Sequence, residues 1–264
     1  MKTWQELGFQ LIFSEDGSPT LRPYPDGQSM HHLGGALAES IFIYDKASEV
    51  FLNDLKGTKA GQLRFLIVGL GLAYIELLIL KRAVLMKLET SKMYLRSHES
   101  QCCLTENISR FLTGSASDGE VMATYSQILH GICQTDLKGG MLPLDQQELL
   151  AQQIKELGAQ LLKNQQWEIF GILDEQSAEL KQTSPPFDVI YFDAYSEKAS
   201  PELWSESLLK GLIQNLCAPT AVFATYACTG RLSRCLNQAG FVSVRSEGFK
   251  GKRNSTLMTR VPLT

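Results

Sequence analysis

The chain has 264 residues, 44% of them hydrophobic and 20% charged, which suits one large α/β core with appendages. No apolar stretch reaches the ~20 residues of a membrane span, the N-terminus lacks the apolar core of a signal peptide, and a net charge of −3 excludes a protein that coats nucleic acid by bulk charge. The six cysteines show no C-x-x-C spacing and the four histidines no H-x-x-x-H spacing, so we expect reduced thiols, a cytoplasmic location and no metal site.

The first 60 residues are predicted to form an extension that precedes the main domain. Phe9–Phe13 and Thr20–Arg22 flank a turn with glycine and proline, which predicts a β-hairpin. A short helix is expected over Ala47–Leu55. His31 and His32 lie in a polar, glycine-rich connection, and we favour a pair that packs against the core domain over a catalytic pair.

The main motif is a glycine bend between apolar segments. The apolar run Phe65–Val68 ends in Gly69–Gly71, and the apolar segment Ala73–Leu80 follows. A second run, Ala83–Leu88, ends on Glu89. This order predicts a strand, a turn, a helix, a second strand and an acid. Because an acid at the tip of the second strand can accept both hydroxyls of a ribose, the pattern predicts a nucleoside-cofactor site.

The spacing of the small residues distinguishes between cofactors. A dinucleotide motif, G-x-G-x-x-G, would place its third glycine at Tyr74, whose side chain obstructs close packing of the helix on the strand. The bend instead reads G-x-G-x-A, with Gly69, Gly71 and Ala73 at the small positions. S-adenosylmethionine enzymes commonly carry G-x-G-x-G in this loop. We therefore expect S-adenosylmethionine, with an ordinary tight turn between strand and helix as the alternative.

Residues 92–165 are predicted to form a helical insertion between the second and third strands. Gln146–Leu162 has a helical period. The expected apolar face of this helix contains Leu149, Leu150, Ile154, Leu157, Leu161 and Leu162. Gly114–Gly119 is expected to be a loop. We expect the insertion to cover the core, and a partner or substrate surface is the alternative.

From Trp167 onward the sequence alternates between strand and helix patterns. Strands are expected at Trp167–Leu173, Phe187–Phe192, Ala221–Tyr226, Phe241–Arg245 and Thr256–Val261, and helices through Lys181, over Leu203–Leu216 and over Arg231–Gln238. The last two strands are expected to form a closing antiparallel pair. The predicted fold is therefore α/β and Rossmann-like, with one antiparallel strand in a mostly parallel sheet over residues 61–264, the architecture of class I methyltransferases.

Three acids follow predicted strands, at the edge of an open α/β sheet where ligands bind. Glu89 suits a ribose, Asp174 suits the adenine amino group, and Asp193 suits the methionine amine or a substrate amine. A substrate amine must lose its proton when it attacks the methyl group, and Asp193 can orient the amine and take that proton. The alternative for each acid is a helix N-cap or a solvated loop carboxylate.

The stretch that begins at Asp193 contains the most specific motif. Residues 193–204 read DAYSEKASPELW and resemble the Asp-Ala-Phe-Ser-Pro-Lys-x-Asn-Pro-x-x-Trp signature of MnmC-like methyltransferases. Further matching positions lie at 29–31, 38–40, the glycine bend, 224–226, 230, 239–241 and 248–253. The resemblance covers roughly residues 28–90 and 167–260 and leaves the helical insertion unexplained.

This resemblance implies S-adenosylmethionine as the cofactor and an aminomethyl group on the wobble uridine of tRNA as the methyl acceptor. It implies that Asp193 and Tyr195, the latter in the family's phenylalanine position, frame the acceptor. It also places Glu39 at the cofactor and Lys198 at the substrate. The family's FAD-dependent oxidase domain has no counterpart in this sequence, so we expect this chain to perform the methyl step alone, with a separate oxidase as a candidate partner.

Three positions depart from the family's pattern. Ala73 replaces a glycine, Ser200 replaces an asparagine, and Glu197 replaces a proline. Glu197 adds a negative charge where a tRNA phosphate is expected to pass.

A small basic patch is predicted near the C-terminus. It consists of Lys250, Lys252 and Arg253, together with Arg231 and Arg234. Such a patch can hold an RNA backbone. The alternative is a solvated hairpin tip.

Two other functions fit parts of the pattern. A polyamine-synthase-like aminopropyl transferase has the same fold and an acid after the fourth strand, but only scattered acids are seen here rather than a paired-acid pocket for a polycation. A non-catalytic relative that serves as a binding module would have lost cofactor binding at the altered bend. Calorimetry with S-adenosylmethionine and methyl transfer to tRNA distinguish these possibilities.

Overall fold

The computed structural model describes residues 2–25, 27–54, 61–115, 119–177, 180, 185–244, 249–251 and 255–260. The chain divides into two compact units, which are described separately below. The first unit contains residues 1–41, 70–93 and 101–169. The second contains residues 42–69, 94–100 and 170–264. The division at residue 60 that the sequence suggests remains a prediction.

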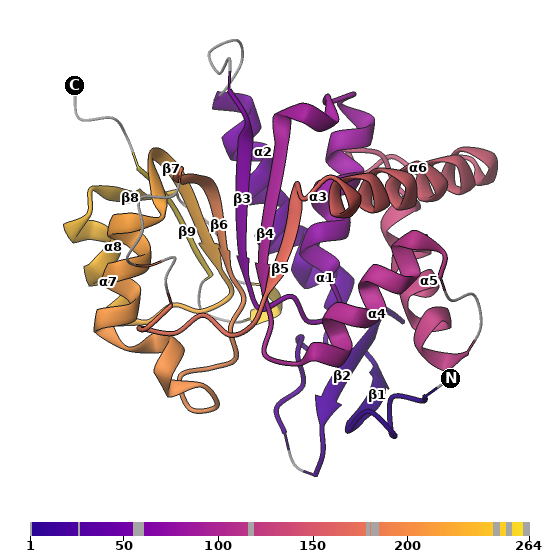
Figure 1. The fold of residues 1–264 in the computed structure, drawn as a ribbon, viewed down its shortest axis with the longest axis horizontal. Coiled ribbons are helices and arrows are strands. Elements are labelled where there is room, and N and C mark those ends of the chain that lie inside the picture. Colours follow the sequence, from indigo (N-terminus) through magenta and orange to yellow (C-terminus); the bar gives the residue numbers. More distant parts are fainter. Residues whose placement is uncertain are drawn as a thin grey trace. The chain divides into compact units, whose positions relative to one another are not determined.

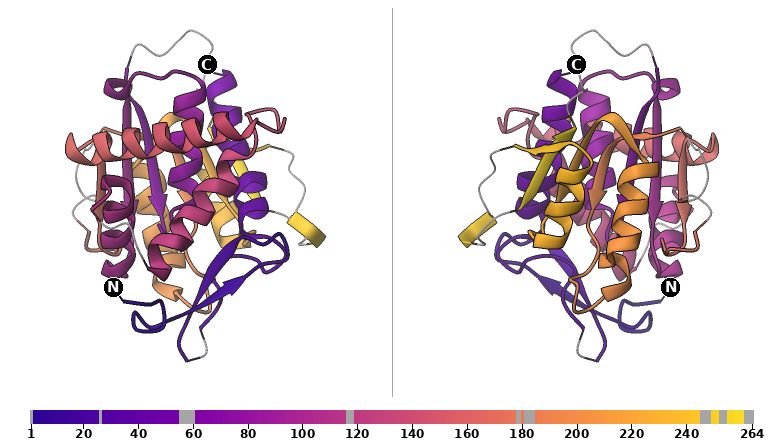
Figure 2. Two further views of the ribbon diagram at one scale, coloured as in Figure 1. Left: turned by 90° about the vertical axis from the view of Figure 1, so that its right-hand side faces the viewer. Right: turned by 90° about the vertical axis from the view of Figure 1, so that its left-hand side faces the viewer.

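The first unit combines a β-hairpin with helices. Its elements are β1 (Phe9–Phe13), β2 (Pro19–Pro23), α1 (Ala36–Ser40), α3 (Tyr74–Leu85), η2 (Thr90–Lys92), α4 (Cys102–Thr113), α5 (Glu120–Cys133) and α6 (Leu144–Lys163). Strands β1 and β2 pair in antiparallel fashion, with Leu11 opposite Leu21, which confirms the predicted hairpin. The long helix α6 packs across α3, α4 and α5 (Figure 2).

The second unit contains most of the sheet. Its elements are η1 (Ile41–Asp45, whose first residue belongs to the first unit), α2 (Lys46–Asp54), β3 (Leu63–Val68), β4 (Met93–His98, whose first residue belongs to the first unit), β6 (Phe187–Phe192), η4 (Pro201–Trp204), α7 (Glu206–Asn215), β7 (Cys217–Thr225), α8 (Gly230–Gln238), β8 (Phe241–Ser243), η5 (Phe249–Gly251) and β9 (Thr256–Arg260). The unit boundary also crosses β5 (Trp167–Phe170), of which only Phe170 belongs to the second unit.

The strands follow the order β5-β4-β3-β6-β7-β9-β8 (Figure 1). Strand β6 runs parallel to β3 and β7, whereas β9 is antiparallel to both of its neighbours, β7 and β8. This arrangement confirms the predicted mostly parallel sheet that closes with an antiparallel strand. Because β3, β6 and β7 are parallel, their carboxyl ends meet at one edge of the sheet, which is where ligands bind in open α/β folds.

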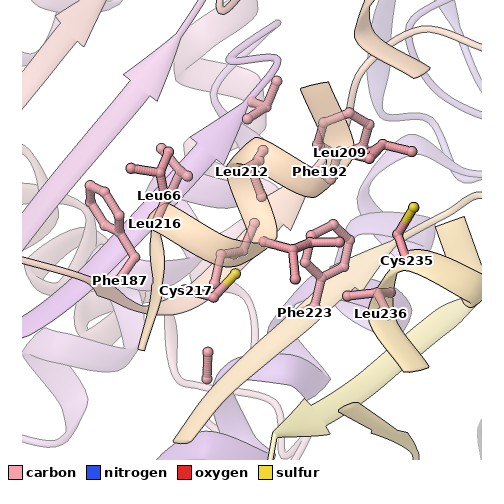
Figure 3. Packing of buried hydrophobic residues seen from close by; sticks show 14 of the residues in the cluster. Leu66, Phe187, Phe192, Leu209, Leu212, Leu216, Cys217, Phe223, Cys235 and Leu236 are labelled. Atoms are coloured by element: carbon pink, nitrogen blue, oxygen red, sulfur yellow. The ribbon is translucent and has the colours of Figure 1, made fainter. Parts of the chain in front are cut away.

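Alternating residues of the strands face different helices in the second unit. Phe192 and Phe223 are buried in one cluster with Leu209 and Leu212 of α7 and Leu236 of α8 (Figure 3). Val189 and Tyr191 of β6 point to the opposite face of the sheet, where α2 contacts β6 and β7. The core thus has helices on both faces of the central strands, which leaves the strand ends as the polar edge.

The prediction of a second strand over Ala83–Leu88 is wrong. Residues 83–85 belong to helix α3, and the strand next to β3 is β4, ten residues later than expected. Helix α3 is buried around its whole circumference from Tyr74 to Ala83, so its apolar residues are not confined to one face and show no helical periodicity. Periodicity alone cannot separate such a helix from a buried strand.

Strand β4 was not predicted because it contains polar residues, which are nevertheless buried in the structure. All six of its residues are buried, including Arg96 and His98. The Arg96 guanidinium donates to the Tyr94 hydroxyl and lies 5.0 Å from the ring centroid of Phe170 and 5.4 Å from that of Phe187. These aromatic faces accommodate a buried cation, a tertiary arrangement that a local sequence pattern does not reveal.

The insertion is helical, as predicted, but it begins after β4, at α4 rather than at residue 92. On α6 the predicted residues Leu150, Ile154 and Leu161 are buried, whereas Leu149 is exposed. The predicted loop at 114–119 and the predicted helix through Lys181 fall partly outside the described residues. Within the described residues, no helix is both long enough and apolar enough to cross a membrane.

Candidate functional site

The carboxyl ends of three strands meet around Gly69 in the second unit. The backbone N–H of Gly69, directly after β3, donates to the carbonyl of His98 at the end of β4, at 2.9 Å. The backbone N–H of Asp193, directly after β6, donates to the carbonyl of Val68 at 2.8 Å. The acids that follow β4 and β6, Glu99 and Asp193, therefore stand on either side of Gly69.

Gly69 cannot be replaced by another residue without distortion. Its φ of +96° lies in the region that glycine adopts most readily. A Cβ atom at this position would lie 2.5 Å from the carbonyl oxygen of Asp193. Glycine at position 69 thus permits the close approach of the Asp193 backbone.

Glu89 does not occupy the position that motivated its prediction. It precedes β4, is exposed, and forms an ion pair with Lys92 at 3.2 Å. The acid that follows the strand next to β3 is Glu99, which is partly exposed and whose backbone N–H donates to the Phe170 carbonyl at 3.0 Å. Sequence reasoning missed Glu99 because it missed β4.

Asp193 lies where the sequence placed it, at the end of β6. Its Oδ1 accepts a hydrogen bond from the hydroxyl of Tyr44 at 2.5 Å. Tyr44 is buried and comes from the π-helical turn η1. The apolar run before α2 gave no sign that this tyrosine reaches the acid, so its contribution was missed.

Tyr195 presents a buried hydroxyl for which the described residues provide no partner. Burial raises the pKa of this hydroxyl, and the nearby Glu99 and Asp193 raise it further. The hydroxyl is therefore protonated and is a donor at any physiological pH. The loop that carries it is held by Trp204, whose ring N–H donates to the Tyr195 carbonyl at 2.6 Å. The Tyr195 hydroxyl, a buried donor near Glu99 and Asp193 without a partner among the described residues, is therefore a candidate contact for an acceptor atom of a ligand.

The remaining small positions of the bend belong to the first unit. Gly71 has a φ of +50°, and Ala73 adopts a left-handed conformation, with φ 60° and ψ 28°, immediately before α3. Ala73 thus takes the conformation that glycine adopts more easily. The adjacent Tyr74 turns to the hairpin, where its hydroxyl donates to the Pro19 carbonyl at 2.8 Å. In the same unit Glu39 is buried and its Oε2 accepts the His32 backbone N–H at 2.8 Å.

Strand β5 ends at Phe170 rather than at Leu173 as predicted, so Asp174 lies in the turn beyond the strand, and its carboxylate stabilises that turn. Oδ1 accepts from the Gln176 backbone N–H and from the Ser177 hydroxyl, both at 2.9 Å. This matches the loop-carboxylate alternative, although a carboxylate has capacity for further donors. Among the described residues no group of three or more histidine, cysteine, aspartate or glutamate side chains is arranged to hold a metal ion.

The negative charge of Glu197 is compensated. Its carboxylate pairs with Arg231 at 2.6 Å, and the same guanidinium nitrogen donates to the Trp204 carbonyl at 2.8 Å. Arg231 therefore braces the loop after Asp193 against α8. Lys198, in the same loop, is exposed.

The C-terminal basic segment is described only in part. Lys252 and Arg253 lie outside the described residues. Lys250 is exposed beside Phe249, whose ring centroid lies 5.8 Å from that of Phe42 in η1. Lys46, at the start of α2, lies 5.9 Å from the Phe42 ring centroid, so the structure adds a cation that the sequence did not suggest.

Comparison with known proteins identifies the chemistry. Residues 146–260 match a family model described as S-adenosyl-L-methionine-dependent methyltransferase. The match covers less than half of the chain and shows that residues 146–260 are similar to this family. The matched residues include Asp193, Tyr195 and the loop through Trp204. The expected cofactor is thereby confirmed as that of the family.

Relatives of this methyltransferase are bifunctional proteins. The chain is 39% identical over 66 residues to the tRNA 5-methylaminomethyl-2-thiouridine biosynthesis bifunctional protein MnmC of Burkholderia thailandensis, a stretch that covers 25% of this chain and 10% of that protein. It is 36% identical over 76 residues to the protein of the same name from Cupriavidus metallidurans, covering 29% of this chain and 11% of that protein. The aligned stretches thus span about a tenth of these relatives.

A solved structure supports the fold of the methyltransferase. The crystal structure of MnmC2 from Aquifex aeolicus superposes with a TM-score of 0.62 at 19% identity, covering 97% of this chain and 73% of that chain. The fold predicted from the sequence, a class I methyltransferase with an N-terminal hairpin, is confirmed.

Proposed function

We propose that this methyltransferase transfers a methyl group to the nitrogen of an aminomethyl group on the wobble uridine of tRNA. The observation that carries the proposal is the juxtaposition of Glu99, Gly69 and Asp193 at neighbouring strand ends, beside the unpartnered Tyr195 hydroxyl. This arrangement offers acceptors, bare backbone and a donor at the edge where such folds bind ligands.

The residues fit the cofactor. We assign the ribose hydroxyls to Glu99 in place of Glu89, because Glu99 follows the strand next to β3. We assign contact with the cofactor to the backbone of Gly69, Gly71 and Ala73 of the bend, which adopt positive φ angles and carry no side chain larger than a methyl group. Asp174 remains the proposed partner of the adenine amino group. Glu39 remains a proposed member of the cofactor site.

The protein's task in this reaction is positioning. S-adenosylmethionine, when bound, supplies an activated methyl group on a sulfonium leaving group. Asp193 accepts a hydrogen bond from the acceptor amine, orients its lone pair and takes the proton released on methylation. Tyr195 donates its hydroxyl hydrogen to an acceptor atom of the ligand. The surrounding apolar side chains of β6 and η4 exclude water.

The similarity to proteins of tRNA 5-methylaminomethyl-2-thiouridine biosynthesis supports tRNA as the substrate. We propose that Lys198, Lys250, Lys252 and Arg253 contact its phosphates, since such contacts position an RNA without reading its sequence. A separate FAD-dependent oxidase that supplies the aminomethyl substrate is the proposed partner, and the cytoplasm is the proposed location.

Methyl transfer to tRNA tests the proposal. The wild-type protein is incubated with radiolabelled S-adenosylmethionine and tRNA from a strain that lacks the methylated wobble uridine. We expect label in the wobble nucleoside, no label with Asp193→Asn, and none with tRNA from a wild-type strain. Putrescine with the decarboxylated cofactor is a parallel reaction. Aminopropyl transfer there without methylation of tRNA would contradict the proposal, and so would the absence of any heat on titration with S-adenosylmethionine.

A further inference from the structure

Two tyrosine hydroxyls join the segment 41–54 to β6 within the second unit. Tyr44 of η1 donates to Oδ1 of Asp193 at 2.5 Å. The hydroxyls of Ser48 in α2 and Tyr191 in β6 lie 2.5 Å apart. Tyr44 and Tyr191 are both buried, and their rings meet edge to face with centroids 6.0 Å apart.

The spacing of the four residues along their segments explains why both contacts form. Residues 191 and 193 lie on the same side of the chain because side chains alternate along an extended segment. Residues 44 and 48 are four apart, so they share one side of the helical segment. The π-helical turn Ile41–Asp45 contains Tyr44. Such turns occur frequently at functional sites, where the widened turn changes the direction of a side chain.

We propose that Tyr44 is a positioning residue that holds the Asp193 carboxylate in the orientation in which it receives the acceptor amine. This inference rests on the proposed function, since it presumes that Asp193 contacts the amine. Removal of the hydroxyl leaves the ring, the helix and β6 in place, and it withdraws one donor from the carboxylate. The hydrogen bond between Ser48 and Tyr191 also joins the segment 41–54 to β6, but its two hydroxyls are not part of the Asp193 carboxylate.

The hydrogen bond from Tyr44 to Asp193 can be tested through its effect on the pKa of the Asp193 carboxyl. The Tyr44 hydroxyl donates to the Asp193 carboxylate, and the charges of Asp193 and Glu99 both act on the Tyr195 hydroxyl. A donor to a carboxylate stabilises its charged form, so loss of the donor raises the carboxyl pKa. A hydrogen bond to a charged group corresponds to a shift of roughly one to two pH units.

The test compares Tyr44→Phe with the matched control Tyr191→Phe, which removes a hydroxyl contact between the same two elements. The first readout uses the free protein: the carboxyl carbon-13 resonance of Asp193 is titrated with pH and assigned by its loss in Asp193→Asn. We expect the titration midpoint to rise by roughly one to two pH units in Tyr44→Phe and to stay within about 0.3 units in Tyr191→Phe.

The second readout separates positioning from binding. We expect kcat for methyl transfer to fall about tenfold in Tyr44→Phe with KM for tRNA within about threefold, and the acid limb of the pH profile to move upward with the carboxyl midpoint. Equal effects in both variants, or an unmoved Asp193 midpoint in Tyr44→Phe, would overturn the inference. If the carboxyl midpoint shifts but wild-type protein shows no methyl transfer, the hydrogen bond is established and the proposed function has failed instead.

Discussion

Three buried polar side chains of the first unit contrast with one of the second. In the first unit, the Tyr74 hydroxyl donates to the Pro19 carbonyl at 2.8 Å, the Trp4 ring N–H donates to the Thr124 hydroxyl at 2.9 Å, and His31 Nδ1 lies 3.0 Å from the Thr20 hydroxyl. In the second unit, Tyr195 buries a hydroxyl for which the described residues offer no acceptor. These three groups of the first unit have partners within the fold, whereas the Tyr195 hydroxyl can still donate to a ligand.

This contrast separates stability from function. A buried polar group that has a protein partner contributes to folding, and its loss leaves the partner unsatisfied. A buried polar group without a partner costs stability and persists where a ligand supplies the bond. Substitution of Tyr74 should therefore change the free energy of unfolding, whereas substitution of Tyr195 should change ligand binding.

The largest expected effect lies at Asp193. Asp193→Asn retains the shape of the side chain and removes the base, so we expect kcat to fall by about 10²–10⁴-fold. Affinity for S-adenosylmethionine should stay within about tenfold, or ~1.4 kcal/mol. Single-turnover kinetics and calorimetry provide the two measurements. A loss of cofactor affinity much larger than tenfold would mean that Asp193 serves the cofactor rather than the acceptor.

Acid should weaken the first unit through His31. Burial lowers its pKa from 6.5 to about 4, although Glu39 and Asp16 oppose the shift. The folded-state pKa is below the unfolded one, so the unfolded chain binds the proton first, and stability is lost as pH falls from about 6.5 to about 4. The loss is on the order of 3 kcal/mol. Denaturant unfolding at a series of pH values measures it.

The matched variant for this measurement is His31→Gln, which has no titrating ring. Its unfolding free energy should depend less steeply on pH across this window than that of the wild type. Identical slopes in the two proteins would show that His31 does not carry the acid sensitivity of the first unit.

A pair of tyrosine substitutions tests the contrast between the units directly. Tyr74→Phe leaves the buried Pro19 carbonyl without its donor, so we expect a destabilisation of about 1–3 kcal/mol. Tyr195→Phe removes an unpartnered hydroxyl, so stability should be unchanged or slightly higher, while ligand affinity falls by about 0.5–1.5 kcal/mol. Thermal melts and calorimetry of both variants give the comparison. Destabilisation by Tyr195→Phe equal to that by Tyr74→Phe would remove the distinction.

The smallest expected effect is at Ala73. Its left-handed conformation, at φ 60°, is costly for alanine and free for glycine. Ala73→Gly should stabilise the protein by roughly 0.5–1 kcal/mol after the greater entropy of an unfolded glycine is counted. Denaturant unfolding measures this gain. A loss of stability would indicate that the alanine methyl group contributes packing worth more than the strain.

Much of the fold could be predicted because its central strands have local signals. The apolar run of β6 from Phe187 to Phe192 was predicted to the residue, and the turn between β1 and β2 marks the hairpin. The helix after the glycine bend was predicted, but its C-terminal end and strand β4 were not, because their burial depends on neighbours distant in the sequence. Helix α3 is buried on all sides, so no exposed face marks its length, and Arg96 in β4 is buried against aromatic rings.

The site was predicted in part for the same reason. Asp193 follows a strand with a clear signal and lies at the expected strand end. The sequence placed Glu89 at the end of the strand next to β3, whereas Glu99 occupies that strand end, because β4 went unrecognised. Tyr44 could not be found because its contact with Asp193 spans 149 positions of the chain.

The central claim is that the acid after β4, not the one before it, binds the cofactor. Isothermal titration of S-adenosylmethionine into Glu99→Gln and Glu89→Gln tests this claim most directly. We predict that Glu99→Gln weakens binding by about 1.5–3 kcal/mol, roughly 10- to 150-fold, and that Glu89→Gln leaves it within about twofold. Wild-type affinity in Glu99→Gln, with the loss appearing in Glu89→Gln, would contradict the account.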